Sequence, residues 1–373
     1  MKKTLLSILL AVVMLSGSLF SQEEEGGFES TLTKLAGDAG KGFVQPIVSG
    51  FGNNMNGGWF HKAPKSKIFG IDLEFGLVAM GTFTTEENKT FTANGAFKFS
   101  GGAIGTNSQA ENIASGINNW ALLPNNEKQA IVDAISNTNF QVGIAGPTVV
   151  GTKQDTMKIS LASTLFQYTS PNTNTTNSVT IPGAVTRLDG VTGVLDGASI
   201  IPLAAPQFSI GTIYGTQATF RYLPEVEISK ELGKFKYFGF GVQHNLGMWL
   251  PIPVVDVAAS FFTQKLEVGT IMEANTTSFG VNAAKQFGFA FLNVTPYAGF
   301  MFESSKMKFG FDYTYKSGAA NTEVKDRISF ELEGENTTRI TLGLGIRLGI
   351  ININADYNLG TQNSATAGLF LAF

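Results

Sequence analysis

Residues 343–360 read GLGIRLGIININADYNLG, and the spacing of apolar side chains in this stretch decides the fold class. Up to Leu348 the apolar side chains occupy even positions, and from Ile351 onward they occupy odd positions. Strict alternation is the pattern of a β-strand with one apolar face. A two-residue turn at Gly349-Ile350 explains the change of parity, and glycine in its first position favours type II′. We therefore predict a hairpin in which Leu348 faces Ile351 and Arg347 faces Asn352.

The polar face of this hairpin distinguishes two kinds of β protein. Each arm has about nine residues, enough to cross a bilayer when tilted. The polar face carries Gly, Thr, Asn and Arg347, which suits the lumen of a barrel, whereas a soluble sandwich turns its polar face outward. The pattern of these strands alone is compatible with both folds.

The C-terminus favours the barrel. The chain ends SATAGLFLAF, with apolar residues at every second position counted back from a terminal aromatic residue. This ending resembles the assembly signal of bacterial outer-membrane barrels, which their insertion machinery reads. The resemblance implies that Leu369, Leu371 and Phe373 form the signal.

The N-terminus and the composition point to an exported membrane protein. Lys2 and Lys3 precede LLSILLAVVMLSGSLF, which we interpret as a signal peptide over residues 1–21. A membrane anchor is the alternative, but the apolar run is short and contains Ser16 to Ser18. The chain has 43 Gly and 31 Phe, only 15% charged residues, and no later apolar run of helical spanning length. We expect it in the bacterial outer membrane.

The same alternation recurs along the chain and sets the expected domains. It is found in residues 68–83, 91–99, 157–168, 206–211, 217–228 and 237–250, and in three stretches between 255 and 315. We predict an all-β fold, a transmembrane antiparallel β-barrel of about 12–14 strands over residues 67–373. Short and long connections alternate, as periplasmic turns and external loops do, with the C-terminus on the periplasmic side. The exception is the long connection 101–153, where we expect a small helical insert at about 107–138 or two further strands.

Residues 22–66 are expected to form a helical, plug-like segment before the barrel. FESTLTKLAGDAGKGFVQPIV places apolar residues three or four positions apart, on one helical face. The sequence leaves open whether this segment lies in the lumen or in the periplasm. GFGNNMNGGWFHKAP follows it and suits an irregular crossing to the first strand.

Three motifs carry a resemblance to a known family. NNMNGGWFHKAP, FRYLPEV and GFGVQHNLGMWLP resemble an uncharacterised family of exported proteins common in Bacteroidota. The resemblance implies an outer-membrane barrel, similar in outline to the FadL-type transporters of hydrophobic compounds, which also have an N-terminal plug. It implies no catalytic residues.

The ionisable residues indicate a polar lumen rather than an active site. No hydrolase, metalloprotease or phosphate-loop motif is present, so we expect neither an enzyme nor a cofactor. His61 falls in a loop and His244 on an apolar face, at the bilayer rim. With no Cys, disulfides are excluded and a metal site is not expected. The candidate lumen charges are Asp72, Glu74, Arg221, Glu225, Arg347 and Asp356.

Two functions fit these features. The first is a passive channel or transporter for small hydrophobic molecules. The second is a structural, adhesion or assembly barrel with a filled lumen. A net charge of −3 without a basic cluster argues against nucleic acid, so the expected partners are outer-membrane lipid, the insertion machinery and a small hydrophobic ligand. A continuous apolar tunnel would favour transport, and a lumen blocked by salt bridges would favour the second function. The candidate ligand contacts are Phe43, Phe51, Met55, Trp59 and Phe60.

Overall fold

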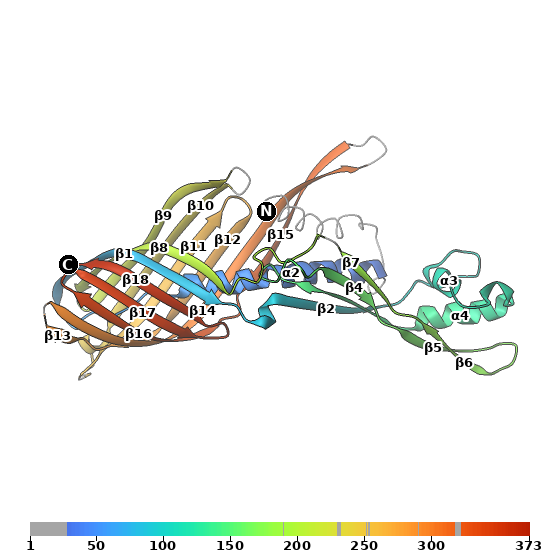
Figure 1. Ribbon diagram of the computed structural model, residues 1–373, viewed down its shortest axis with the longest axis horizontal. Helices are drawn as coiled ribbons and strands as arrows, with labels where there is room; N and C mark the ends of the chain where they lie inside the picture. The colour runs from blue at the N-terminus through green and yellow to red at the C-terminus, as the bar shows by residue number, and fades with distance from the viewer. Residues whose placement is uncertain are drawn as a thin grey trace. The chain divides into compact units, whose positions relative to one another are not determined.

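The computed structural model divides the chain into two compact units (Figure 1). It describes residues 28–188, 190–229, 233–250, 252, 254–289, 291–317 and 322–373, so the expected signal peptide lies outside the described residues. One unit contains the chain up to Val44 and residues 86–197, and we call it the insert unit. The other contains residues 45–85 and 198–373, and we call it the barrel unit.

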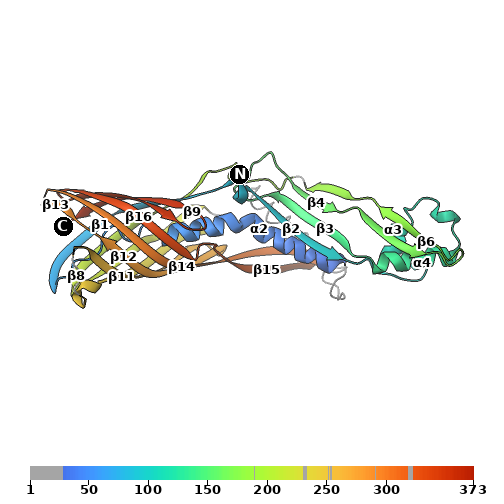
Figure 2. The ribbon, with the colours of Figure 1, turned by 90° about the horizontal axis from the view of Figure 1, so that it is seen from below.

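The sheet of the barrel unit closes on itself. Twelve strands form this sheet in the described residues, and ten of them close a barrel. The barrel is closed because β12 (Met272–Ala284) pairs with β14 (Leu292–Ser317), and because β1 (Phe69–Phe83) pairs with both β8 (Ile200–Ile213) and β18 (Ser364–Ala372). Every pairing is antiparallel (Figure 2). The ten barrel strands are β1 (Phe69–Phe83), β8 (Ile200–Ile213), β9 (Thr216–Ser229), β10 (Gly233–Asn245), β11 (Asp256–Val268), β12 (Met272–Ala284), β14 (Leu292–Ser317), β16 (Thr338–Leu348), β17 (Ile351–Leu359) and β18 (Ser364–Ala372).

Among the described strands, two more pair with β14 alone. The short β13 (Phe287–Phe289) pairs with its start, and β15 (Thr322–Glu333) pairs with its second half. A 3-10 helix, η3 (Leu246–Met248), lies between β10 and β11.

The hairpin of β16 and β17 has the predicted register. Leu348 pairs with Ile351 and Arg347 pairs with Asn352. Gly349 has a φ of +61° and Ile350 has no positive φ, as a type II′ turn requires. The predicted hairpin and its turn are confirmed.

The barrel wall is apolar outside and polar inside. On β16, Leu342 is 55% exposed whereas Thr341 is 3% exposed. The same inversion holds on β17 and β18, where aliphatic side chains are exposed and Asn358 and Thr366 are buried. A soluble barrel would show the reverse, so the outer wall is built to face lipid. The predicted all-β transmembrane barrel is confirmed, but it closes with ten strands instead of 12–14.

The lower strand number has a simple cause. Residues 91–99 and 157–168, counted among the barrel strands from their alternation, lie in sheets of the insert unit. One sheet contains β2 (Thr90–Phe97), β3 (Phe140–Pro147), β4 (Met157–Leu161) and β7 (Ala184–Leu188), and the other contains β5 (Thr164–Thr169) and β6 (Thr176–Ile181).

The insert unit has its own small core. Phe99 packs edge-on against Phe97 and Phe140, with ring centroids 4.9 and 4.8 Å apart. Its other elements are η1 (Glu86–Lys89), α3 (Gln109–Ala114), η2 (Trp120–Leu122) and α4 (Asn125–Asn137). The last three fall where a helical insert was expected.

In the chain, the whole of residues 86–197 belongs to the connection between β1 and β8. That connection joins the two strands at the end of the barrel where the longer loops lie, and we call this end the loop end. The opposite end contains the Gly349 turn, and we call it the short-turn end. The long connection 101–153, which was an exception on the periplasmic side, is therefore part of the connection at the loop end.

Helix α2 (Phe28–Asn56) contains Pro46, and the boundary between the units falls within it. No helix in the described part of the chain is both long enough and apolar enough to cross a membrane. Residues 45–66, which we call the lumen segment, run through the barrel (Figure 2). At the loop end the Gln45 side chain donates to the Glu333 carbonyl (2.8 Å), and at the short-turn end Asn245 donates to the Pro64 carbonyl (2.5 Å).

Candidate functional site: the occupied lumen

The barrel wall supplies the cations that cap α2. The last carbonyl groups of a helix lack helical partners and carry partial negative charge. Helix α2 has no basic residue in its last turn. Arg221 on β9 donates to the carbonyl oxygens of Met55 (3.2 Å) and Gly57 (2.8 Å), and Arg339 on β16 donates to that of Asn53 (2.6 Å). The lumen segment is thus held by two guanidinium groups of the wall.

Both arginines are buried and both are compensated. Arg339 forms an ion pair with Glu303 on β14 at 2.6 Å, and both side chains are almost fully buried. Arg221 donates to the Gln207 side chain (2.9 Å) and lies 4.1 Å from the centre of the Trp59 ring. A buried charge without such partners is strongly unfavourable. The lumen segment therefore provides hydrogen-bond partners for both guanidinium groups. Without the segment, these two groups would lose those partners.

Trp59 is the largest apolar group in the lumen. Its ring stacks on Phe262 with centroids 5.0 Å apart, and its indole nitrogen donates to the Met55 carbonyl (3.0 Å). Gly239 on β10 makes room for it, because a Cβ atom at that position would lie 2.8 Å from the ring. Phe60 meets Tyr297 edge-on at 6.1 Å. These rings form one buried cluster inside the polar wall.

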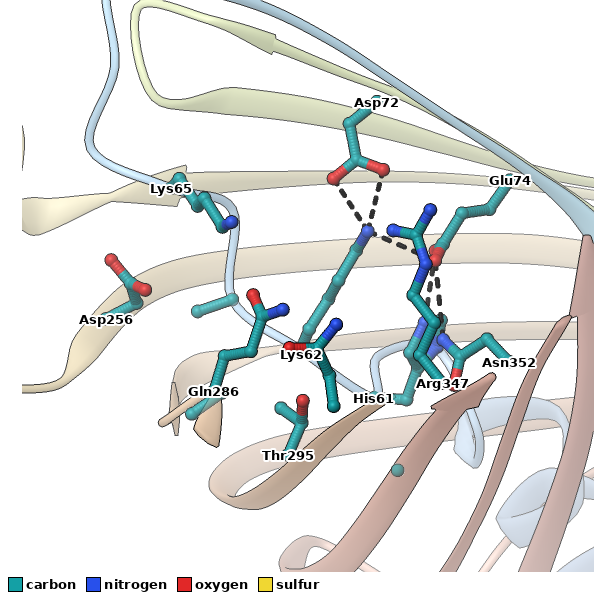
Figure 3. A pocket seen from close by; sticks show the side chains of 14 residues that line it. His61, Lys62, Lys65, Asp72, Glu74, Asp256, Gln286, Thr295, Arg347 and Asn352 are labelled. Carbon is teal, nitrogen blue, oxygen red and sulfur yellow. Dashed lines mark hydrogen bonds and ion pairs between the residues drawn. The ribbon is translucent and has the colours of Figure 1, made fainter. Parts of the chain in front are cut away.

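A second set of contacts holds the lumen segment at the short-turn end (Figure 3). The Lys62 ammonium lies 2.7 Å from Asp72 and 3.1 Å from Glu74, both on β1. His61 Nε2 lies 3.0 Å from the second Glu74 oxygen. The two carboxylates that the sequence placed in the lumen thus neutralise a residue of the lumen segment.

The three motifs that carry the family resemblance meet in the lumen. NNMNGGWFHKAP is most of the lumen segment itself, and FRYLPEV contains Arg221. GFGVQHNLGMWLP contains Gly239 beside Trp59, and Gln243, which donates to the Lys62 carbonyl (3.4 Å). The motifs therefore describe one packed interface between wall and segment.

The expected ligand contacts are largely packing residues. Met55, Trp59 and Phe60 are buried in the lumen, and Phe51 is half-buried on the lumenal part of α2. Phe43 is buried in the insert unit, so the structure does not group it with the others.

The expected lumen charges divide in the same way. Asp72, Glu74, Arg221 and Asp356 line the lumen, and Asp356 accepts from the Tyr297 hydroxyl (2.9 Å). Arg347 lies half-buried at the short-turn end. Glu225 differs from the expectation, because it is exposed and pairs with Lys234 at 3.1 Å. It lies where β9 approaches the loop end, beyond the filled lumen.

The remaining predicted positions lie on the outer wall. Leu369, Leu371 and Phe373 are all exposed there, and their role as an assembly signal stays a prediction. His244 Nδ1 lies 2.9 Å from the Thr216 hydroxyl, and its Nε2 accepts from the Trp249 indole (2.7 Å). The exposed Trp249 is suited to the interface of a bilayer.

Sequence reasoning missed Arg339, Glu303, His61 and Lys62 as lumen contacts. Arg339 could have been found, because it has the same parity as Arg347 on the polar face of β16. Nothing in the sequence pairs Lys62 with β1. Within the described residues no cluster of three or more His, Cys, Asp or Glu side chains is arranged to hold a metal ion. The absence of enzymatic activity stays a prediction.

Fold and site together define a class: a membrane β-barrel whose lumen is occupied by its own N-terminal segment. Over residues 1–373 the chain matches the model of a family of unknown function, DUF6588, and it belongs to that family. No curated protein matches it.

Solved structures resemble the chain only distantly. The N-terminal β-barrel domain of Pseudomonas aeruginosa OprF has 14% identity over 42% of this chain and 94% of that one, with a TM-score of 0.18. Ail, the attachment invasion locus protein of Yersinia pestis, has 15% identity over 42% and 96%, with a TM-score of 0.20. OmpT, an outer membrane protein of Vibrio cholerae, has 8% identity over 82% and 99%, with a TM-score of 0.21. These TM-scores are too low to carry a function across.

Proposed function

We propose that this chain is a bacterial outer-membrane protein whose barrel is a closed anchor for the insert unit and not an open channel. The exposed apolar wall supports a membrane location, and the N-terminal sequence supports export. Outer-membrane lipid then surrounds the wall, and the barrel-insertion machinery recognises the C-terminal strand. The insert unit acts in adhesion or assembly.

One observation carries this proposal: the lumen segment satisfies two buried arginines. If the segment left, Arg221 would lose the carbonyl groups of Met55 and Gly57, and Arg339 would lose that of Asn53. Leaving buried polar groups unpaired costs about 1–3 kcal/mol for each neutral group and more for charged ones. An open state of the barrel is therefore strongly disfavoured.

Chain connectivity supports an external side of the membrane for the insert unit. Short turns of such barrels are periplasmic and long loops external. The Thr84 amide donates to the Ser199 carbonyl (3.1 Å), so the chain leaves and re-enters the barrel unit at the loop end. With the usual orientation, residues 86–197 connect to the barrel on the external side.

Conductance in planar bilayers tests the closed state. The purified protein should show no stable open-channel current, whereas the Arg221→Ala/Arg339→Ala double variant should show flickering or stable current. Lys234→Ala, at an exposed loop-end position, is the matched control and should stay silent. Stable current from the unaltered protein would refute the anchor proposal.

Epitope labelling on intact cells tests the orientation. An epitope after Asn172, in the exposed turn between β5 and β6, should be labelled without permeabilisation. An epitope after Trp249, at the short-turn end, should be labelled only after permeabilisation. The reverse pattern would contradict the proposed orientation.

Passive transport of small hydrophobic molecules is the competing proposal, and it follows from the outline similarity to FadL-type proteins. A ligand would have to pass Met55, Trp59 and Phe60, all of which are tightly packed. It would have to displace Trp59 from Phe262. Saturable binding of laurate with a change in Trp59 fluorescence would favour transport over the closed anchor.

A further inference from the structure

A polar cavity opens at the short-turn end of the barrel unit (Figure 3). Its volume is about 90 Å³. The lumen segment and strands from several sides of the barrel line it. The contacts that hold the lumen segment, Lys62 with Asp72 and Glu74, form one side of this cavity.

Three neighbouring strands present a row of hydrogen-bond donors to the cavity. Arg347 on β16 pairs in register with Asn293 on β14 and with Asn352 on β17. Residues directly opposite each other on adjacent strands have Cβ atoms about 4.5–5.5 Å apart, so the three side chains lie side by side. Gly345, opposite Thr295, also lines the cavity, and a Cβ there would lie 3.7 Å from Asn352 Oδ1 and from the Thr295 carbonyl oxygen.

Some hydrogen-bond donors of this row have no partner among the described residues. Arg347 donates through Nε to the Gly349 carbonyl (2.9 Å) and through Nη2 to the Ala372 carbonyl (3.0 Å), which leaves three of its five N–H groups. No described carboxylate forms an ion pair with it. Asn293 is 7% exposed, and its side chain forms no hydrogen bond to a described residue. A guanidinium flanked by amides is the chemistry that binds a carboxylate.

A free negative charge lines the same cavity. Asp256, at the start of β11, accepts a hydrogen bond from the Asn245 amide (3.0 Å) and forms no ion pair with any described cation. Figure 3 shows Asp256 and Arg347 on opposite sides, with Lys62 between them. Lys62 is already neutralised by Asp72 and Glu74. Lys65 also lines the cavity and forms no ion pair with a described residue, so the cavity offers two free cations, Arg347 and Lys65, and one free anion, Asp256.

We propose that this cavity binds a small zwitterion, such as a free amino acid. Its carboxylate lies on Arg347 and Asn293, and its ammonium group faces Asp256. A simple anion would meet repulsion from Asp256, and a simple amine would meet repulsion from Arg347 and Lys65. The site is independent of whether the barrel conducts, since it lies at the mouth and needs no movement of the lumen segment.

Isothermal titration calorimetry on the full-length protein in detergent micelles tests the proposal with three probes of similar size. L-Alanine should bind saturably, and propionate and propylamine should each bind at least roughly tenfold more weakly. Arg347→Gln and Asp256→Asn should each weaken L-alanine binding by about tenfold or more. Lys234→Gln, at the loop end, should leave the affinity unchanged.

A second variant guards against misfolding. Gly345→Leu adds a bulky side chain to the cavity lining without removing any charge, and it should also abolish L-alanine binding. Heat-modifiability on gels confirms that each variant is a folded barrel. Absence of saturable L-alanine binding, equal binding of propionate, or unchanged affinity in both charge variants would overturn the proposal.

Discussion

The Arg221 guanidinium, on β9, lies 4.1 Å from the centre of the Trp59 ring, although the two residues are far apart in the chain. The same group donates to the carbonyl oxygens of Met55 and Gly57. One wall residue thus closes the end of α2, stabilises the turn that follows it and packs on the ring after the turn.

Replacing Arg221 with Ala should loosen the lumen segment. Two carbonyl groups and the Gln207 side chain would lose a donor, and Trp59 would lose its cation. We expect a loss of about 3 kcal/mol in the free energy of unfolding. Limited trypsin digestion should reveal it as faster cleavage after Lys62.

An exposed arginine provides the control for this substitution. Arg187 lies on β7 of the insert unit and is exposed, so Arg187→Ala should change neither stability nor cleavage after Lys62. If Arg221→Ala behaves like Arg187→Ala, the wall does not hold the segment as described.

Gly349→Val should slow refolding of the barrel. Gly349 has a φ of +61°, a conformation that costs a β-branched residue about 1–2 kcal/mol. Refolding from urea into micelles, followed by heat-modifiability, should show the delay.

Gly345→Ala is the matched control, on strand β16 just before the turn. A Cβ at Gly345 would meet nothing closer than 3.7 Å, and its φ is not positive. Equal refolding rates for the two variants would mean that the turn does not limit hairpin formation.

The main chain and the side chain of Phe373, at the seam between β1 and β18, can be tested separately. Its amide donates to the Leu73 carbonyl (2.8 Å), and its carbonyl accepts from the Leu73 amide (3.3 Å). Deletion of Phe373 removes the aromatic side chain and both of these bonds, whereas Phe373→Ala removes only the side chain. If the ring is the assembly signal, both variants should insert poorly in cells.

A refolding comparison in micelles, without the insertion machinery, completes that test. There Phe373→Ala should fold as well as the unaltered chain. Normal membrane yield of Phe373→Ala in cells would show that the ring is not the assembly signal.

The local features of this fold could be predicted from the sequence. The register of Arg347 with Asn352 follows from parity alone, because alternation is a property of neighbouring residues. The strand number could not, because residues 91–99 and 157–168 alternate as barrel strands do but belong to other sheets. An alternation with a period of two residues shows that the two faces of a strand differ. It does not show which sheet the strand belongs to.

The contacts inside the lumen could not be predicted from the alternation of apolar and polar residues. Arg221 and Met55 are separated by 166 positions, and Arg339 and Asn53 by 286. The sequence indicated that charges face inward, but it could not indicate that a backbone segment would receive them. The glycine-rich NNMNGGWF stretch was the available signal, because close approach of a guanidinium to a main chain needs small residues. A Cβ at Gly57 would lie 2.8 Å from Arg339 Nη1.

Gly239→Ala should disturb Trp59 specifically. The new Cβ would lie 2.8 Å from the far edge of the ring, and overpacking of this kind costs about 1–3 kcal/mol. The shift should be visible as a change in Trp59 fluorescence, measured in a background where the other two of the three tryptophans are replaced with Phe. The Trp59→Phe substitution removes the part of the ring that collides, so Gly239→Ala should destabilise the protein much less in that background. A double-mutant cycle on the free energy of unfolding measures this coupling, and a cost of Gly239→Ala that is the same with Trp or Phe at position 59 would mean that Trp59 does not pack against β10.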